Sequence, residues 1–384
     1  MRVIEPGGTI GFLGGGQLAR MMALEARRMG YRIAVLDPDS HGPAAAVADR
    51  HVKGQLDDLE AARFLAACSD VLTLDTEHVP SVLLARLEEM VPVRPSSHVL
   101  GVVQDRREQR AFLEELDVPQ VLHAPVDNEA MLSEAAAVTG YPCVLKSRRS
   151  GYDGKGQARV EHEGELESAW RSIGRVPAIM ESFVQFEREI SVLLARDFAG
   201  EIRFHPIAEN EHRRHILHTT RVPARVDGDL VRRAEAIGAA IANAFDYVGM
   251  MAVELFVTGD GGLLVNEIAP RTHNSGHYTF GACATSQFEQ HIRAICGLPL
   301  GDPALLRPAM MLNVLGDAWQ DGPPSWDVVH RHANAKLHLY GKQKPSAGRK
   351  MGHVLVLGDP DAEAAAVVET IAAGLGASKH ARSA

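Results

Sequence analysis

KSRRSGYDGKGQ, residues 146–157, places three glycines and four cations directly after the apolar run of residues 142–145. Glycine lets backbone N–H groups approach anionic oxygens closely, and the lysines and arginines can neutralise the charge of those oxygens. No G-x-x-x-x-G-K-[ST] pattern occurs here, so the segment is not a Walker A loop. It predicts a strand that ends at Lys146, followed by a loop that closes over a polyphosphate and excludes water. A basic surface hairpin without a ligand is the alternative.

The composition indicates a globular chain of two or three domains. Of the 384 residues, 46% are hydrophobic and 23% are charged, and the formal net charge is −9. This acidic balance argues against a nucleic-acid binder, and there is no run of about 18 apolar residues that would predict a membrane span. The N-terminus lacks the layout of a signal peptide, so we expect a cytoplasmic protein. The four cysteines form no C-x-x-C pair, which supports neither a zinc site nor a disulfide framework.

Patterns along the chain predict three domains that combine α/β and α+β architecture. Residues 1–105 alternate short strands with helices, which predicts a parallel, Rossmann-like sheet, including a strand near Val91. Residues 106–186 predict a small α+β lid that carries the glycine loop. In residues 187–384, strands joined by Gly/Asp turns predict a larger body with an antiparallel sheet.

A second glycine-rich turn lies near the N-terminus. The sequence Gly14-Gly15-Gly16-Gln17-Leu18-Ala19 fits the dinucleotide fingerprint G-x-G-x-x-G/A, and Asp37 follows at the end of the second strand, about 20 residues later. This makes an NAD-dependent oxidoreductase the first rival interpretation. Other strand-to-helix turns use the same glycines for packing or for other phosphates, so the pattern alone does not decide the function.

Two glutamates flank the turn at residues 259–262. If these four residues form the loop of a hairpin, Thr258 pairs with Leu263, and Glu254 lies directly opposite Glu267. Two facing carboxylates repel, and Glu254 stands between apolar neighbours, so a bound divalent cation would account for the pair. Carboxylate oxygens suit Mg²⁺ that is bridged to nucleotide phosphates. Two exposed acids on an edge hairpin are the alternative.

Polar side chains follow the second of these strands. Arg271, His273 and Asn274 come directly after it, and Arg271 suits a phosphate or a carboxylate. We therefore expect substrate ligands at this point of the chain.

A basic turn lies between residues 340 and 353 and contains Lys342, Lys344, Arg349 and Lys350. In an acidic chain it predicts a second phosphate pocket, with a solvated basic turn as the alternative.

Three histidines, His212, His215 and His218, recur at a spacing of three, which matches no zinc site. We expect one of them to face a ligand, the others to lie at the surface or in the core, and none to bind a metal.

These motifs resemble the ATP-grasp superfamily, and within it the family of 5-(carboxyamino)imidazole ribonucleotide synthetases of purine biosynthesis. The similarity runs almost from end to end, and its most specific segments are GYDGKGQ (151–157), RTHNSGHYT (271–279) and GRKMGH (348–353). It implies an ATP-grasp fold preceded by a Rossmann-like, pre-ATP-grasp domain with a parallel sheet. The oxidoreductase interpretation is thereby set aside.

The resemblance also implies which residues act. ATP would be bound by Arg106, Lys146, Gly151, Tyr152, Asp153, Gly154, Lys155, Gly156, Gln157, the hinge residues Glu181, Ser182, Phe183 and Val184, and by Glu189, His212, Asn266 and Glu267. Mg²⁺ would be bound by Glu254 and Glu267. Aminoimidazole ribonucleotide would be bound by Gln17, Glu77, Arg271, His273, Lys342 and Arg349. Positions near the bicarbonate and the reacting amine are matched by Tyr152, Asp153, Lys155 and Asn274. The sequence departs from the family pattern at Asp75, at His78 and at Arg110, where a lysine is common.

The implied reaction carboxylates aminoimidazole ribonucleotide with bicarbonate and ATP, through carboxyphosphate. The alternatives are another ATP-grasp ligase, such as a formate-dependent glycinamide ribonucleotide transformylase, and a nucleotide-binding protein without catalysis. The family further implies a homodimer and a downstream mutase that takes up the labile product. We expect neither a nucleic-acid nor a membrane partner.

Overall fold

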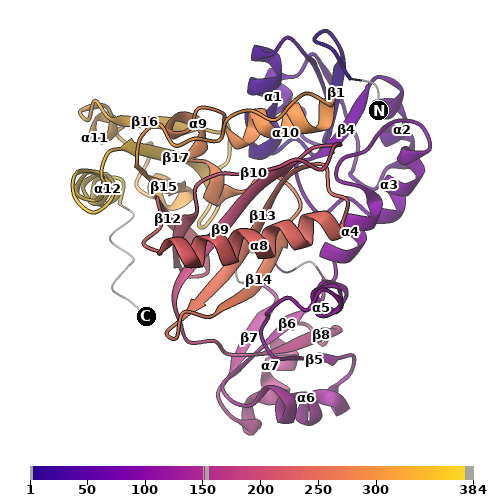
Figure 1. The fold of residues 1–384 in the computed structure, drawn as a ribbon, viewed down its shortest axis with the longest axis vertical. Coiled ribbons are helices and arrows are strands. Elements are labelled where there is room, and N and C mark those ends of the chain that lie inside the picture. The colour runs from indigo at the N-terminus through magenta and orange to yellow at the C-terminus, as the bar shows by residue number, and fades with distance from the viewer. Residues whose placement is uncertain (1–2, 150, 152–154, 377–384) are drawn as a thin grey trace.

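The computed structural model describes residues 3–149, 151 and 155–376 (Figure 1). Its strands form three sheets along the long axis of the molecule, with the N-terminal sheet at the top of the view, the largest sheet in the middle and a small sheet at the bottom. The expected combination of α/β and α+β architecture is confirmed. The exact limits of the three domains stay a prediction.

The N-terminal sheet is parallel and has the strand order β3-β2-β1-β4. Its strands are β1 (Thr9–Leu13), β2 (Arg32–Leu36), β3 (Arg50–Val52) and β4 (Val71–Leu74). The helices of this part are α1 (Gln17–Arg28), α2 (Leu59–Ala67), α3 (Ser81–Glu88) and α4 (Ser97–Val103). Most strand residues are apolar and fully buried, as expected where helices cover a parallel sheet.

The strand expected near Val91 is wrong. This segment forms only an isolated parallel bridge between Val93 and Leu72. Pro92 and Pro95 lie close by on either side of Val93, and they lack the N–H groups that a longer ladder requires.

The small sheet is antiparallel and has the strand order β5-β8-β6-β7. Its strands are β5 (His123–Val126), β6 (Cys143–Ser147), β7 (Gln157–Val160) and β8 (Ala178–Ser182). Helix α5 (Arg106–Glu115) leads into it, and α6 (Leu132–Thr139) and α7 (Leu166–Ser172) pack on it. Leu145, Trp170 and Met180 lie in a core that belongs to this unit alone, which fits the predicted lid.

The large sheet is antiparallel and has the order β14-β13-β9-β11-β12-β15-β17-β16, with β10 paired to β9. Its strands are β9 (Phe186–Arg196), β10 (Ile202–Phe204), β11 (Ala208–Arg213), β12 (Ile216–Val222), β13 (Gly249–Thr258), β14 (Leu263–Ala269), β15 (Ala309–Leu315), β16 (Ala335–Leu339) and β17 (Lys350–Leu357). The accompanying helices are α8 (Gly228–Ala244), α9 (Thr279–Ala282), α10 (Gln287–Cys296), α11 (Asp327–His330) and α12 (Glu363–Gly374). Short 3₁₀ turns are η1 (Ala45–Val47), η2 (Glu129–Met131), η3 (Glu163–Glu165), η4 (Asn274–Gly276) and η5 (Gly316–Trp319).

Helix α10 joins the N-terminal sheet to the large sheet. Phe288 and Ile292 pack in the core of α1 and β1. His291 lies 2.7 Å from Thr73 Oγ1 of β4 through Nε2, and its Nδ1 accepts the N–H of Met250 of β13 at 3.1 Å. Because Nδ1 accepts, the ring proton must be on Nε2, which donates to the hydroxyl. One neutral imidazole thus links two sheets, and burial lowers the pKa of His291 to about 3.

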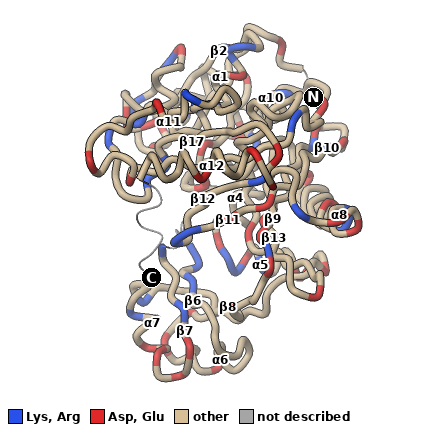
Figure 2. The backbone as a smooth tube through the Cα atoms, turned by 90° about the vertical axis from the view of Figure 1, so that its left-hand side faces the viewer, with Lys and Arg blue, Asp and Glu red and all other residues tan. Residues whose placement is uncertain are grey.

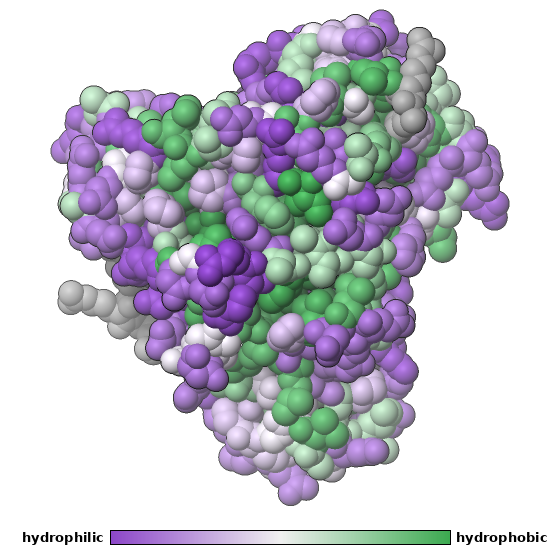
Figure 3. Space-filling view, viewed as in Figure 1, coloured by the Kyte–Doolittle hydropathy of each residue, from purple (hydrophilic) through white to green (hydrophobic). Residues whose placement is uncertain are grey.

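The segment that leads into the lid is anchored on the body. Val99 of α4, Leu113 of α5 and Val118 belong to the same core as β9, β13 and α8. Figure 3 shows apolar residues in a green band that runs from the body toward the lid on this face. None of the helices in the described part of the chain is long and apolar enough to cross a membrane.

Candidate active site

Glu254 and Glu267 face each other across the β13–β14 hairpin, as the sequence predicts. The predicted turn register is wrong by one residue, because Leu263 pairs with Val257. A β-bulge at Asn266 compensates for this shift, so that the ladder continues with the two glutamates opposite each other. The bulge interrupts the alternation of the strand, and Asn266 and Glu267 are both half-buried. Asn266 therefore need not point away from the carboxylates, as strict alternation would require.

The surroundings of Glu254 disfavour its charge. Burial and then the Glu267 carboxylate raise the pKa of Glu254 to about 7. His273 Nδ1 lies 3.8 Å from Glu254 Oε1. Burial and the charge of Arg271 hold the pKa of His273 well below its usual value, so this ring does not supply a compensating charge. The charges of His212 and Lys350 lower the pKa of Glu254 but do not offset burial and Glu267, and a divalent ion would favour the doubly charged form.

A row of polar side chains continues from these glutamates across β9 and β11. Ser191 lies opposite Glu254 and accepts a hydrogen bond from Asn210 Nδ2 at 2.7 Å. His212 Nδ1 lies 2.6 Å from Glu189 Oε2. Burial opposes the imidazolium, but the hydrogen bond and the charge of Glu189 outweigh it and raise the pKa of His212. Of the remaining two histidines of this segment, His215 is exposed and His218 is buried.

Lys146 is the last residue but one of β6, which ends at Ser147, one residue later than predicted, and it meets the hinge through Glu181. Lys146 Nζ donates to Glu181 Oε2 at 2.5 Å, while Arg110 donates from Nε and Nη2 to Oε1 at 2.9 and 2.7 Å. Burial alone would raise the pKa of Glu181, but the charges of Lys146 and Arg110 hold it well below its usual value. The charge of Arg106 also acts on both Lys146 and Glu181. The base of the lid therefore concentrates three cations around one carboxylate.

The glycine loop connects β6 to β7. Gly156 has a φ of +71°, and a Cβ at this position would lie 2.5 Å from Ser147 Oγ, so a larger residue would be strained there. A Cβ on Gly151 would lie 3.7 Å from Arg106 Nη2, which places this predicted phosphate contact beside the loop. Lys155 is exposed. Gln157 is the residue opposite Lys146 in the ladder. Three residues predicted for ATP binding or catalysis lie outside the described residues: Tyr152, Asp153 and Gly154.

The hinge after β8 is fixed to the lid by backbone hydrogen bonds. Ser182 N–H donates to Leu122 O at 2.9 Å, and Phe183 N–H donates to Pro142 O at 3.1 Å. The guanidinium of Arg159 lies 4.0 Å from the centre of the Phe183 ring. Val184, the last predicted hinge residue, is half-buried. Residues 182 and 183 of the hinge are therefore bonded to segments of the lid.

The predicted substrate residues of the first domain and the body meet at one point. Arg271 Nε lies 2.8 Å from Glu77 Oε1. Asn274 is buried, and its Nδ2 finds no hydrogen-bond partner among the described residues; the same holds for Thr272 Oγ1. Buried polar atoms usually have a partner, and these two belong to the segment that follows Arg271, so they are candidates for a ligand contact. His273 Nδ1 contacts Ser275 Oγ at 2.8 Å.

The glycine turn after β1 does not offer its amides to a dinucleotide. Gly15 N–H donates to Asp37 Oδ2 at 2.7 Å. Gly16 and Ala19 donate to the two oxygens of Asp75 at 2.9 and 2.7 Å. A dinucleotide would need these amides for its pyrophosphate and Asp37 for its ribose. The fingerprint here serves the N-terminus of α1, and Asp75, a departure from the family pattern, is the acceptor.

The basic turn is stabilised by its own residues. Arg349 Nη1 donates to Lys344 O at 2.6 Å, and Lys342 Nζ lies 5.9 Å from the centre of the Tyr340 ring. Lys350 was predicted only as a member of this turn, yet its charge acts on His212, Glu254, His273 and His277. The segment GRKMGH was the signal that pointed to it. Gln17, the first residue of α1, is half-buried.

Figure 2 shows the charges of the site from the side. Blue segments around β6 and β7 of the lid and red segments near β9 and β13 of the body lie on either side of the junction between lid and body. This distribution suits an anion that carries a metal ion on one side.

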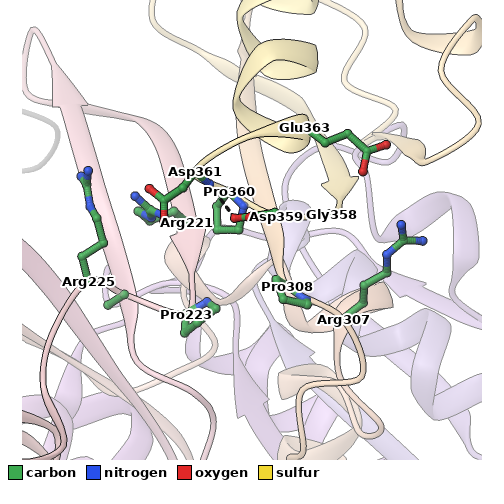
Figure 4. A pocket seen from close by; sticks show the side chains of 11 residues that line it. Arg221, Pro223, Arg225, Arg307, Pro308, Gly358, Asp359, Pro360, Asp361 and Glu363 are labelled. Carbon is green, nitrogen blue, oxygen red and sulfur yellow. Dashed lines mark hydrogen bonds and ion pairs between the residues drawn. The ribbon is translucent and has the colours of Figure 1, made fainter.

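A surface pocket of about 500 Å³ lies elsewhere, at the opposite end of the strands of the large sheet (Figure 4). It lies beside Gly358, just after the end of β17, whereas Lys350 begins that strand. Arg221 pairs with Asp361 at 2.7 Å inside the pocket. No predicted site residue lines it, so we assign the chemistry to the junction of lid and body.

A small antiparallel sheet with a glycine loop between two of its strands, next to a larger antiparallel sheet with two opposed carboxylates, is typical of an ATP-grasp protein. Residues 111–288 match the ATP-grasp domain, residues 8–104 match the ribonucleotide synthetase preATP-grasp domain, and residues 309–367 match the phosphoribosylaminoimidazole carboxylase C-terminal domain.

Comparison with individual relatives shows which family of ATP-grasp proteins the chain resembles. The N5-carboxyaminoimidazole ribonucleotide synthase of Brucella melitensis is 44% identical over 353 residues, which are 91% of this chain and 96% of the relative. A solved N5-carboxyaminoimidazole ribonucleotide synthetase in complex with ADP superposes with a TM-score of 0.93 at 43% identity, over 100% of both chains. The Aspergillus clavatus enzyme, solved with ADP and 5-aminoimidazole ribonucleotide, gives a TM-score of 0.91 at 31% identity, over 97% of this chain and 99% of the other. The chain therefore belongs to the family of N5-carboxyaminoimidazole ribonucleotide synthases.

Proposed function

We propose that the protein uses ATP to carboxylate the exocyclic amine of 5-aminoimidazole ribonucleotide with bicarbonate. A bicarbonate oxygen attacks the γ-phosphorus of ATP, the bond from that phosphorus to the β-phosphate oxygen breaks, and ADP and carboxyphosphate form. The amine nitrogen then bonds to the carbon, either of carboxyphosphate or of CO₂ released from it, while phosphate leaves and the amine loses a proton. The observation that carries the proposal is the facing pair Glu254–Glu267 beside the cationic base of the lid.

The donor set of the body suits Mg²⁺. No group of three or more His, Cys, Asp or Glu that could hold a metal occurs in the described parts of the chain, so a metal site would rest on Glu254 and Glu267 together with phosphate oxygens. Two carboxylates with substrate phosphates are a common way to hold Mg²⁺. When held by Glu254 and Glu267, Mg²⁺ would neutralise part of the negative charge of the phosphates.

The residues proposed for ATP surround the junction of lid and body. From the lid, Arg106 and Lys146 would face the phosphates, and the loop from Gly151 to Gln157 would cover them. The hinge from Glu181 to Val184 would contact the base, and the body would contribute Glu189, His212, Asn266 and Glu267. This arrangement is supported by the cations at the base of the lid and by the polar row on β9 and β11.

The ribonucleotide would lie between the first domain and the body. We assign its binding to Gln17, Glu77, Arg271, His273, Lys342 and Arg349, supported by the Arg271–Glu77 contact between the two parts. Asn274 would donate its unpartnered amide to a substrate oxygen. For the reacting groups we propose that Lys155 stabilises anionic oxygens, Asp153 orients Lys155 or the amine, and Tyr152 covers the substrate.

Membership of the family also suggests the oligomeric state, the localisation and a partner of the protein. We propose a cytoplasmic homodimer, associated through the first or the third domain, with domains at 1–105, 106–186 and 187–384. The labile product would be taken up by a mutase. Light scattering after gel filtration tests the dimer, and a monomer at micromolar concentration would contradict it.

The decisive experiment measures ADP formation from Mg·ATP and bicarbonate with and without aminoimidazole ribonucleotide. We expect strong stimulation by the ribonucleotide and one ADP for each carboxylated product. Glycinamide ribonucleotide with formate is the control acceptor pair. Stimulation by that pair instead would keep the ATP-grasp chemistry and overturn the proposed substrate.

A further inference from the structure

Arg110, a fully buried arginine of α5, contacts both the lid and β14, the strand that carries Glu267. We infer that Arg110 is a positioning residue that holds the lid cation Lys146 and the carboxylate pair Glu254–Glu267 in one geometry. The inference rests on the ATP and metal site proposed above. Only 2% of the Arg110 side chain is exposed.

The guanidinium joins elements that are distant in the sequence. Nε and Nη2 donate to Glu181 Oε1 of β8 at 2.9 and 2.7 Å. Nη1 donates to Val265 O and Nη2 to Asn266 O of β14, both at 3.0 Å. Residue 110 therefore connects the lid strand next to Lys146 with the segment directly before Glu267.

The two carbonyls belong to the β-bulge that sets the register of the metal pair. Asn266 is the extra residue that returns Glu267 to its place opposite Glu254. A bulge disrupts the ladder locally, so its buried polar groups need other partners. The planar fork of an arginine can bond acceptors in several directions at once, which a lysine ammonium on one flexible stem cannot reproduce. Arg110 thus stabilises the bulge, and through it the position of Glu267.

Arg110 also changes the balance of charge at the base of the lid. It occupies Oε1 of Glu181, while Lys146 bonds only to Oε2. The single carboxylate of Glu181 cannot neutralise both Lys146 and Arg110, so net positive charge remains to attract a phosphate. Without Arg110, Lys146 would be the direct counter-ion of Glu181, and its attraction for an anion would fall.

These two contributions can be separated by two substitutions. Arg110→Lys keeps the positive charge but loses most of the bonds to the bulge. Arg110→Gln loses the charge as well. Arg221 supplies the matched control, because it is also buried (8% exposed), pairs with an acid, and lies at the distant pocket of Figure 4. Arg221→Lys and Arg221→Gln report the general effect of altering a buried arginine.

The first measurement is calorimetric binding of ADP in the presence of EDTA, which reports the lid cations without metal. We expect Arg110→Gln to weaken this binding about tenfold and Arg110→Lys to weaken it less than about threefold. The second is Mn²⁺ binding to the enzyme–ADP complex by electron paramagnetic resonance, which reports the carboxylate pair. Both Arg110 variants should weaken it at least about fivefold, with the Arg221 variants close to the wild type.

The inference would be overturned if the Arg110 and Arg221 variants weakened ADP and Mn²⁺ binding equally, or if neither set of variants weakened it. If Arg110→Gln does not fold, the Mn²⁺ affinity of Arg110→Lys decides, because this variant keeps the charge and loses most of the bonds to the bulge. Tight Mn²⁺ binding by that variant would then overturn it. A wild-type protein that binds ADP and Mn²⁺ but is not stimulated by aminoimidazole ribonucleotide would contradict the proposed function and leave the role of Arg110 intact.

Discussion

At Glu267 the protein places a carboxylate directly opposite another carboxylate, and a bound cation would relieve their repulsion. Glu254 lies opposite, and its pKa of about 7 is a consequence of burial and of Glu267. Such a pair is unfavourable for folding and favourable for holding a cation. Removing one carboxylate should therefore affect stability and activity in opposite directions.

We expect Glu267→Gln to raise the free energy of unfolding of the metal-free protein by about 0.5 kcal/mol, because like charges no longer face each other. Turnover of Mg·ATP should fall at least about 100-fold, because a proposed metal ligand is lost. Urea unfolding in EDTA and ADP formation check the two effects. Glu187→Gln, at an exposed acid of β9, is the control and should match the wild type in both. Wild-type turnover by Glu267→Gln would exclude this residue from the metal site.

Gly156 offers a test of the glycine loop at the same scale. Gly156→Ala would place a Cβ on a residue with a φ of +71°, only 2.5 Å from Ser147 Oγ. Gly7→Ala shares the positive φ (+93°) but has no atom within 4 Å. We expect the first to lower the free energy of unfolding by about 2–3 kcal/mol and the second by about 1 kcal/mol, since only the first adds a clash. Equal losses by thermal or urea unfolding would show that the contact with Ser147 relaxes freely.

At the scale of elements, α10 is the connector between two sheets. His291 bonds Thr73 of β4 and Met250 of β13. His291→Phe would leave a buried hydroxyl and a buried N–H without partners, so we expect a loss of about 2–4 kcal/mol in the free energy of unfolding. Hydrogen exchange at the Met250 amide should become faster. His162→Phe, at an exposed lid residue, is the control and should stay within about 0.5 kcal/mol of the wild type. Unchanged exchange at Met250 would contradict the connection.

For the whole molecule, buried neutral histidines predict sensitivity to acid. Burial lowers the pKa of His291 to about 3 and of His205, His218 and His338 to about 4. In the unfolded chain these groups take up protons near pH 6.5, whereas in the folded chain they do not, so the unfolded state binds more protons between these values. Stability is therefore fully present above about pH 6.5 and falls toward pH 4, by at most about 1.4 kcal/mol per pH unit for each histidine.

Urea unfolding at pH 7.5, 6.5 and 5.5 measures this slope. His205→Leu should flatten it at little cost at pH 7.5, because both ring nitrogens of His205 are buried and have no hydrogen-bond partner in the described chain. A free energy of unfolding that is constant over this range, or a slope that His205→Leu leaves unchanged, would contradict the prediction.

Local patterns in the sequence determined the elements and the residues that carry the chemistry. Strand β1 follows from the apolar run before the glycine turn, Lys146 lies near the end of its strand, and β13 and β14 are joined by a short turn. Such features depend on neighbours within a few residues or across one hairpin, where periodicity and turn chemistry act. The family resemblance then supplied the chemistry that these residue types share.

The tertiary structure alone decided how distant segments complete the site. The amides of the first glycine turn are bound by Asp75, 59 and 56 positions away, so the apparent dinucleotide motif serves a helix terminus. Arg110 reaches Glu181 across 71 positions and Asn266 across 156. At such separations the packing of the sheets decides which side chains meet. Hydrophobic periodicity in the sequence does not indicate these contacts. The bulge at Asn266 belongs to the same class, because Arg110 reaches the carbonyls of Val265 and Asn266 only once α5 lies against β14.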